Sequence, residues 1–261
     1  MASQPKGYMN TTHLDTVQLL LDDFKLLTYE QMRLQPGQRV LDVGCGPGTD
    51  RIPLARRVGT SGHVVGVDCD EDMIGEAEKR ALEAEVGAWV VHKHADATAL
   101  PFEWGYFDAC RCERLFQHLQ DPAKALSEMT RVTRPGGWIV ALDSAWGSLS
   151  IDSPEIEAER RYVRVLAEHI TNSGYSGRRL YPLFKQQGLV DVSVQVRGVP
   201  FTDYAFARQT LLMDRVEREA MASGVAGVQD VDRLHTCWEE ANADGAFFAS
   251  VSMMLVSGLK P

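Results

Sequence analysis

This 261-residue chain lacks several features that mark other classes of protein. Its 27 basic side chains are outnumbered by 36 acidic ones, so it has a formal net charge of −9 and no general cationic surface for phosphate backbones. The cysteines are odd in number and show no ladder of disulfide spacings, which predicts a reducing compartment. They are Cys45, Cys69, Cys110, Cys112 and Cys237. Nucleic acid and anionic membranes are therefore poor candidate partners, and a cytoplasmic location is expected.

Long apolar runs are also absent. The first residues contain no apolar segment typical of a signal peptide, and the most apolar late stretch, 246–259, is too short and too rich in serine to cross a bilayer. No internal repeat, low-complexity tract or linker rich in proline, glycine and serine divides the chain. With 44 % hydrophobic and 24 % charged residues, the sequence predicts a soluble globular protein with one large domain.

Short β-branched runs alternate with helical patterns between Arg39 and Asp143, which is typical of βαβ units. Helical patterns follow the first, second and fourth runs, and Asp121 is a candidate N-cap for the third of these helices. We therefore expect an α/β, doubly wound sheet with ligands at the carboxyl ends of its strands. The predicted strands cover 39–43, 63–68, 88–94, 106–111 and 137–143.

The remaining segments predict helices around this sheet. A helix with one apolar face is expected over 11–34, two helices over 154–187, and a helical pair over 203–244 broken at 223–227. The whole chain, 1–261, is predicted to be a single domain. Its parts are an N-terminal helical lid (1–38), a cofactor-binding core (39–143), a helical cap (144–189 and 203–245), and the final strands (190–202 and 246–259).

The strongest motif is "VLDVGCGPGTD" at 40–50, where a strand leads into a glycine turn and then a helix. Gly44, Gly46 and Gly48 remove side chains where the backbone turns sharply and approaches a ligand. A dinucleotide fingerprint would place its third glycine at Thr49, and a P-loop would continue with Gly-Lys-Ser/Thr. The spacing therefore disfavours both a standard NAD cradle and a P-loop.

Two aspartates follow the next two strands. Asp68 ends the second strand, 20 positions beyond Gly48, where a carboxylate can accept hydrogen bonds from both hydroxyls of a ribose. Asp96, in "HADATALPF" at 94–102, comes just after the third strand, near the position expected for an adenine amino group. A lone aspartate after a strand is more often a cap or turn residue, but the three elements in order indicate an adenosine-type ligand.

With these motifs the chain resembles the class I S-adenosylmethionine-dependent methyltransferases. It is most similar to the UbiE-like branch, which includes many small-molecule and natural-product enzymes. The matching pieces are "VLDVGCGPGTD", "VVGVDCDEDMIGEAEKRA", "HADATALPF" and "FDACRCERLFQHLQDPAKALSEMTRVTRPGGWIVALD", within about 39–143. The resemblance implies a Rossmann-like, seven-stranded sheet whose last strand is antiparallel, S-adenosylmethionine as cofactor and S-adenosylhomocysteine as product.

The resemblance also implies site residues. It places the glycine turn under the methionine moiety, Asp68 at the ribose, and Asp96 with Ala97 at the adenine. The simplest alternative for Cys45 and Cys69 is that each is a small packing residue. The full cofactor set is Asp42, Gly44, Cys45, Gly46, Gly48, Asp68, Cys69, Met73, Asp96, Ala97, Cys112 and Glu113.

Methyl transfer mainly requires that nucleophile, methyl group and sulfur are held in line in a dry pocket. A base is needed only where the nucleophile must lose a proton, and the candidates in "CERLFQHL" are His118 and Glu113. The alternative to a catalytic role for His118 is a surface or capping role. For Glu113 the alternative is ion pairing with Arg111 or Arg114.

The substrate side is less defined. Asp143, at the end of the fifth strand, is a candidate for turn formation or substrate contact. The aromatic residues outside the core either form a pocket or pack the cap. No metal site is expected, because the C-x-C spacing of Cys110 and Cys112 is interpreted as placing their thiols on opposite faces of a strand. The candidate substrate residues are Tyr8, Asp143, Trp146, Tyr175, Phe201 and Tyr204.

The methyl acceptor is predicted to be a small molecule. "RCERLF" stands where nucleic-acid amino-methyltransferases carry Asn/Asp-Pro-Pro-Tyr/Phe, and no double-glutamate loop of protein-arginine enzymes is present. Specialised-metabolite N- or C-methylation is favoured slightly over O-methylation, with quinone-type C-methylation as the alternative within the class. A non-catalytic cofactor-binding protein and an NAD-dependent oxidoreductase are the alternatives from other classes.

Overall fold

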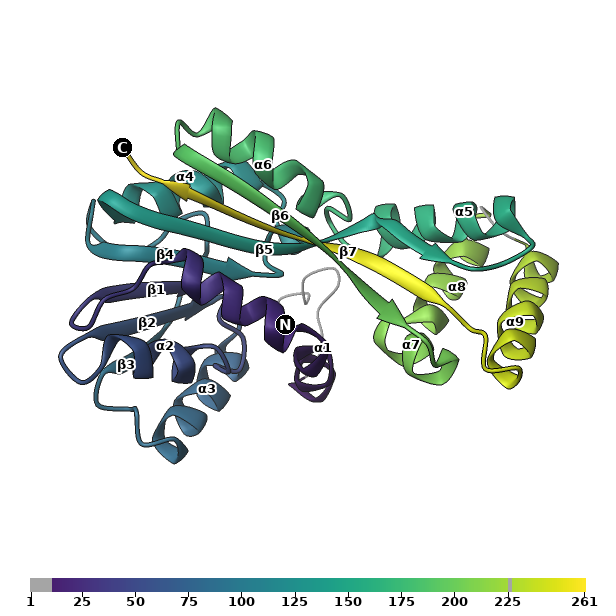
Figure 1. Cartoon of the computed structure of the whole chain (residues 1–261), viewed down its shortest axis with the longest axis horizontal. Coiled ribbons are helices and arrows are strands. Elements are labelled where there is room, and N and C mark those ends of the chain that lie inside the picture. The colour runs from purple at the N-terminus through teal and green to yellow at the C-terminus, as the bar shows by residue number, and fades with distance from the viewer. Residues whose placement is uncertain (1–10, 225–226) are drawn as a thin grey trace.

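A single seven-stranded sheet organises the chain (Figure 1). The computed structural model describes residues 11–224 and 227–261, and for residues 11–20 only the backbone. The strand order is β3-β2-β1-β4-β5-β7-β6, parallel throughout except for β7, which is antiparallel to β5 and β6. This confirms the predicted α/β sheet and its antiparallel last strand. The strands are β1 Arg39–Val43, β2 His63–Asp68, β3 Val90–His94, β4 Phe107–Glu113, β5 Thr133–Ile151, β6 Val190–Phe201 and β7 Ala249–Leu259.

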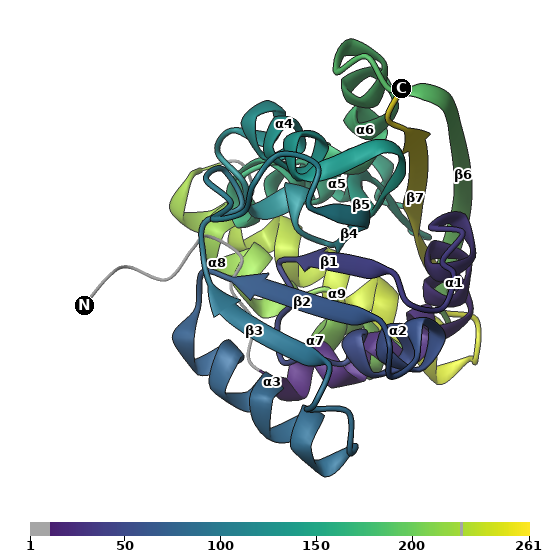
Figure 2. The same cartoon turned by 90° about the vertical axis from the view of Figure 1, so that its left-hand side faces the viewer.

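Helices cover both faces of the sheet, which explains why the central strands read as continuous apolar runs (Figure 2). On one face lie α1 (Thr11–Gln31), α2 (Arg51–Val58) and α3 (Glu71–Glu83); on the other lie α4 (Pro122–Val132) and α6 (Ser176–Gln186). Each face has its own cluster of buried side chains. Because alternate residues of a strand contribute to alternate clusters, the two faces differ in the chemistry that they carry.

Side-chain caps fix where two of the helices begin. The Asp121 carboxylate accepts a hydrogen bond from the Lys124 amide at 2.9 Å, which confirms the predicted N-cap of α4. At the start of α3, Asp70 accepts from the amides of Asp72 and Met73. Asp70 also lies two residues after β2, so this cap sets the direction in which the chain leaves the candidate site.

The long strands carry a group of helices beyond the core, which we call the cap. It comprises α5 (Ile156–Val165), α7 (Tyr204–Thr210), α8 (Met213–Ala222) and α9 (Val228–Ala243), on the right of Figure 1. A five-residue π-helical segment, Leu166–Ile170, continues α5. Since β5 is parallel to β1, β2 and β4 and leads directly into α5, the carboxyl ends of these strands are on the cap side.

Three expectations about this region were wrong. The strand predicted at 137–143 extends over 19 residues, because its continuation pairs with β7 as far as Ile151. Segment 144–189 is not all cap, since its first part is strand and α6 packs on the sheet. Segment 203–244 forms three helices instead of two, because Leu212 has a left-handed backbone (φ 54°) between α7 and α8.

The expected opposite orientation of Cys110 and Cys112 was also wrong. Residues two apart on a strand share a face, and both side chains lie in the cluster packed by α4 and α6. In the described ranges there is no group of three or more His, Cys, Asp or Glu side chains arranged to hold a metal ion. None of the helices within these ranges is long and apolar enough to cross a membrane.

Replacing Trp238 should unfold the cap more easily. Its side chain is 1 % exposed and its ring contacts Tyr162 of α5 and Tyr204 of α7, so Trp238→Ala leaves a cavity between three helices. We expect the free energy of unfolding, measured by urea denaturation, to fall by about 3–5 kcal/mol. Trp104→Ala is the control, because that side chain is 63 % exposed; a comparable loss in both variants would contradict this description of the cap.

Candidate active site

The glycine turn after β1 adopts backbone conformations that other residues rarely reach. Gly44, Gly46 and Gly48 have φ values of 69°, 48° and 88°. The amides of Gly44 and Cys45 both donate to the carbonyl of Val67, at 2.8 and 3.0 Å. These two bonds hold the turn against the end of β2.

Asp68 occupies the other side of this junction. One carboxylate oxygen accepts from the Gly46 amide at 2.8 Å, and the other from the Asp70 amide at 3.1 Å. Burial raises the pKa of Asp68, while these backbone donors act in the opposite direction. Each oxygen of a carboxylate has two acceptor positions, so the group retains capacity for further donors.

The end of β3 lies next to the end of β2. The Ala95 amide donates to the Asp68 carbonyl at 2.9 Å, which brings Asp96 to the same edge of the sheet. Asp96 is exposed, and one of its oxygens accepts from both the amide and the hydroxyl of Thr98. Ala97, which follows Asp96, and Met73, in the first turn of α3, are both buried, so apolar side chains accompany the carboxylates at this edge.

The loop after β4 contacts the glycine turn. A Cβ atom on Gly44 would lie 2.9 Å from Leu115 Cδ1, so the loop packs directly on the glycine turn. Burial raises the pKa of Cys112 far above its usual range and that of Cys45 to about 12. Both thiols are therefore protonated at neutral pH and act as packing groups. Cys69, in contrast, is exposed.

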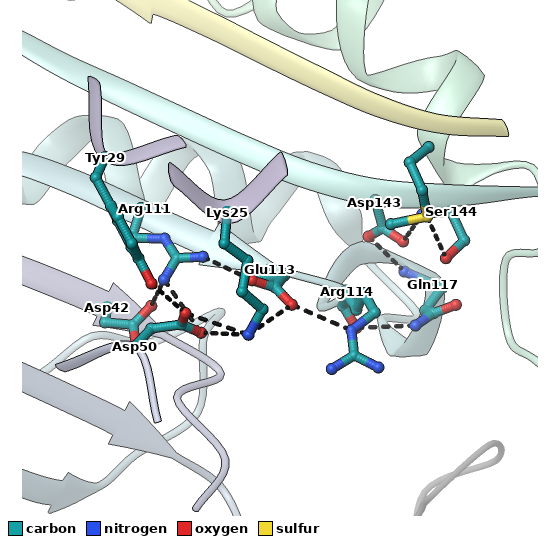
Figure 3. Close-up of polar contacts among 11 residues, drawn as sticks. Lys25, Tyr29, Asp42, Asp50, Arg111, Glu113, Arg114, Gln117, Asp143 and Ser144 are labelled. Atoms are coloured by element: carbon teal, nitrogen blue, oxygen red, sulfur yellow. Dashed lines mark hydrogen bonds and ion pairs between the residues drawn. The ribbon is translucent and has the colours of Figure 1, made fainter. Parts of the chain in front are cut away.

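A buried ion network lies beneath the site (Figure 3). The Arg111 guanidinium, fully buried in β4, is 3.2 Å from Asp50, 2.9 Å from Glu113 and 3.8 Å from Asp42. Burial raises the pKa of Asp42 to about 6 in spite of Arg111. For Asp50 burial acts in the same direction, but Arg111 and Lys25 outweigh it and hold its pKa well below the usual range.

Helix α1 contributes two members to this network. Lys25 Nζ lies 3.2 Å from Asp50 and 3.3 Å from Glu113, and the Tyr29 hydroxyl donates to Asp50. No motif in the sequence indicated that Lys25, Tyr29, Asp50 and Arg111 form a group. The available signal was the arginine inside the otherwise apolar run "FDACRC", since a buried cation needs carboxylate partners.

The two candidate bases differ in their surroundings. Glu113 pairs with Arg111, Lys25 and Arg114, so its carboxylate takes part in the ion pairs that sequence analysis gave as the alternative. His118 ends a short 3-10 turn, Phe116–His118, and is half-buried. Its carbonyl accepts from the Asn172 side chain at 2.7 Å.

Asp143 is buried without exposed surface. Its carboxyl accepts from the amides of Ser144 at 2.8 Å and Gln117 at 3.2 Å, so it shapes the loop that carries His118. Burial raises the pKa of Asp143 to about 7. The structure thus places this residue in the turn-forming position that was one of its two alternatives.

The aromatic candidates separate into two groups. Trp146 Nε1 donates to Gln117, and the Tyr175 ring packs on Gly147, where a Cβ atom would lie 2.2 Å from the ring. Trp146 therefore lies beside the loop after β4, whereas Tyr175 lies against β5. Phe201 and Tyr204 are buried in the cap, where Tyr204 contacts Trp238 and Phe247. Tyr8 lies outside the described residues.

Comparison with known proteins agrees with this arrangement. Residues 40–137 match the family described as "Methyltransferase domain". A demethylmenaquinone methyltransferase of Halalkalibacterium halodurans is 31 % identical over 64 % of this chain and 74 % of its own length. The chain belongs to the class I S-adenosylmethionine-dependent methyltransferases, in the UbiE-like branch.

Two further similarities extend over more of this methyltransferase chain. An uncharacterized 37.1 kDa protein in transposon TN4556 of Streptomyces fradiae is 36 % identical over 89 % of the chain, which spans 66 % of that relative's length. The structure of geranyl diphosphate C-methyltransferase from Streptomyces coelicolor A3(2) superposes with a TM-score of 0.61 at 17 % identity. That superposition covers 97 % of this chain and 85 % of the other.

The cofactor of this family is S-adenosylmethionine, and the residues at the strand ends fit its parts chemically. A carboxylate with spare acceptor capacity, Asp68, suits the ribose hydroxyls. The side-chain-free turn at Gly44 and Gly46 suits close approach of the methionine part, and Asp96 suits an amino group on the adenine.

Asp143→Asn should change how stability depends on pH. Because the pKa of Asp143 is about 7 in the folded state and near 4 in unfolded chains, ionisation of the wild-type residue removes stability as pH rises from about 4 to 7. Asparagine does not titrate, so between pH 5 and pH 8 the variant should gain on the order of 2 kcal/mol relative to wild type in urea unfolding. A constant difference between the two proteins across this range would contradict the buried, ionisable state.

Lys25→Met should weaken the attachment of α1. The change leaves Asp50 and Glu113 with one buried cation fewer, and we expect a loss of about 3 kcal/mol in the free energy of unfolding. Lys79→Met removes the same charge from an exposed position on α3 and should change stability little. Equal stability of the two variants would show that the network does not require Lys25.

Proposed function

We propose that this protein transfers the methyl group of S-adenosylmethionine to a small-molecule acceptor. One observation carries the proposal: the Asp68 carboxylate is fixed by the amides of Gly46 and Asp70 beside the left-handed glycine turn. A carboxylate held in this way can accept hydrogen bonds from both ribose hydroxyls without a change of rotamer. Preorganisation of this kind reduces the entropic cost of binding.

The residues at the strand ends would orient the cofactor. When bound, it supplies a methyl group made electrophilic by the sulfonium. The chain's own task is to hold an acceptor in line with that methyl group and to keep water out. Gly44 with Leu115 packed on it, and buried Cys112, form the apolar floor on which the methionine part would lie. Asp42 would act from beneath, through the ion network with Arg111.

We propose that the acceptor binds beside the loop after β4. Trp146 lies next to this loop and His118 is on it. Tyr175 packs on Gly147, the residue after Trp146, so two aromatic side chains and one imidazole ring are available in this region. His118 is the proposed base where a proton has to leave. Glu113 is a weaker candidate, because its oxygens already pair with cations.

For the reaction itself we propose N- or C-methylation in specialised metabolism, as in natural-product biosynthesis. The Streptomyces coelicolor protein, whose structure contains geranyl diphosphate, supports a small-molecule acceptor. A quinone-type C-methylation is the second candidate, supported by the demethylmenaquinone methyltransferase relative. A non-catalytic cofactor-binding role and NAD-dependent oxidation are the alternatives from other classes that the test must separate.

The test is calorimetric titration with S-adenosylmethionine, S-adenosylhomocysteine and NAD, after bound ligand has been removed. Micromolar binding of the two sulfur nucleotides without NAD supports the proposal, and turnover in a screen of small-molecule acceptors separates an enzyme from a non-catalytic binder. Binding of NAD alone would overturn it.

Asp68→Ala should lose much of this affinity. The variant removes two hydrogen bonds to a charged acceptor, so we expect binding of S-adenosylhomocysteine to weaken by on the order of 2–4 kcal/mol in the same titration. Asp72→Ala is the matched control, since that carboxylate is exposed on the first turn of α3. Unchanged affinity of the Asp68 variant would refute the proposed ribose site.

A further inference from the structure

Gln117, in the loop after β4, has a hydrogen-bond partner for each of its polar atoms and is only 5 % exposed. Its side-chain Oε1 accepts from Trp146 Nε1 at 2.5 Å, and its Nε2 donates to the carbonyl of Arg114 at 3.1 Å (Figure 3). Its backbone amide donates to Asp143, and its carbonyl accepts from the amide of Ser173 at 3.0 Å. These bonds join the loop to β5 and to the segment before α6.

The two partners of the side chain explain why residue 117 is a glutamine. An indole N–H can only donate and a backbone carbonyl can only accept, so the Gln117 amide has one orientation that satisfies both. Methionine, which has a similar length, would leave both partners without a bond. An ionised glutamate would have no donor for the Arg114 carbonyl.

Arg114 has a left-handed backbone, with a φ of 50°. This conformation is costly for a residue that has a Cβ atom, so neighbouring groups have to maintain it. The Arg114 amide donates to the Leu142 carbonyl of β5 at 2.7 Å, while the Arg114 carbonyl accepts from Gln117. The peptide groups on either side of Arg114 are therefore fixed by different partners.

The turn at Arg114 directs the next residue, Leu115, onto the glycine turn. A Cβ atom on Gly44 would lie 2.9 Å from Leu115 Cδ1 and 3.3 Å from Leu115 Cβ, so the leucine fills the volume that a side chain on Gly44 would need. The amide of Gly44 donates to the Val67 carbonyl at 2.8 Å, which fixes the glycine turn independently. The position of Leu115 on this turn therefore depends on the conformation of the loop after β4.

We propose that Gln117 is a positioning residue for cofactor binding: its side-chain amide holds Arg114 in the left-handed conformation and so keeps Leu115 against the glycine turn. This inference rests on the proposed function, in which Gly44 and Leu115 form the floor under the methionine part of the cofactor. Gln117 acts through Arg114 and Leu115, because its own side-chain atoms are bonded within the fold. Loss of its hydrogen bond to Arg114 changes the shape of this floor.

The experiment measures affinity for S-adenosylhomocysteine by calorimetry and the melting temperature of each variant without ligand. Gln117→Met should bind about tenfold more weakly than wild type, the loss that corresponds to one hydrogen bond of typical strength. Gln120→Met is the matched control, because Gln120 is exposed in the same loop, and it should bind like wild type.

Two backgrounds at residue 114 test whether the backbone conformation is the cause. Arg114→Ala and Arg114→Gly both remove the side chain that pairs with Glu113, but only glycine adopts a positive φ without steric cost. Adding Gln117→Met should again weaken binding about tenfold in the alanine background and at most about threefold in the glycine background. A merely structural role of Gln117 predicts equal losses in both backgrounds, and that result would overturn the proposal.

Leu115→Ala provides an independent route that leaves Gln117 in place. It removes the side chain that Gln117 positions, so affinity should fall by a similar factor, and Gln117→Met should add little in this background. Wild-type affinity in Leu115→Ala, or in folded Gln117→Met, would overturn this proposal alone. No binding of S-adenosylhomocysteine by wild type would overturn the proposed function as well.

Discussion

A guanidinium in the middle of a parallel sheet has to be neutralised by carboxylates from neighbouring elements, and the Arg111 side chain imposes this requirement here. Its partners come from three different places: Asp42 from the adjacent strand, Asp50 from the start of α2, and Glu113 from its own strand. Lys25 then joins Asp50 to Glu113 from α1. Segments far apart in the sequence are thereby fixed to one another directly beneath the ends of β1 and β4.

The ion network around Arg111 lies on the same face of the sheet as the glycine turn. Carboxylates on the face covered by α1, α2 and α3 are balanced by buried cations, while Cys110 and Cys112 lie on the other face in a cluster of apolar side chains. The glycine turn lies at the upper end of the charged face, and the backbone amides of Gly46 and Asp70 fix Asp68 there. Side chains in this position are held in place by backbone hydrogen bonds and buried ion pairs.

The extension of β5 and β7 carries the cap. The nineteen residues of β5 extend the sheet beyond the core, and the four cap helices pack around its far end. Trp146 lies along this extension, and Tyr175 packs beside it. The aromatic residues farther along, Phe201 and Tyr204, form part of the cap's own core and hold the helices together.

The strands of the core, the glycine turn, the N-cap at Asp121 and the order of Asp68 and Asp96 after successive strands could all be predicted from the amino-acid sequence. These are local features: apolar runs, glycine positions and cap residues depend on near neighbours in the chain. Three features could not be predicted without the folded chain: Glu113 pairs with three cations, buried Asp143 accepts from two backbone amides, and the buried Arg51 side chain lies over Gly66. Each of those outcomes depends on pairings across strands and on the packing of distant helices, and charge compensation in a buried site is determined by distances that a linear pattern does not contain.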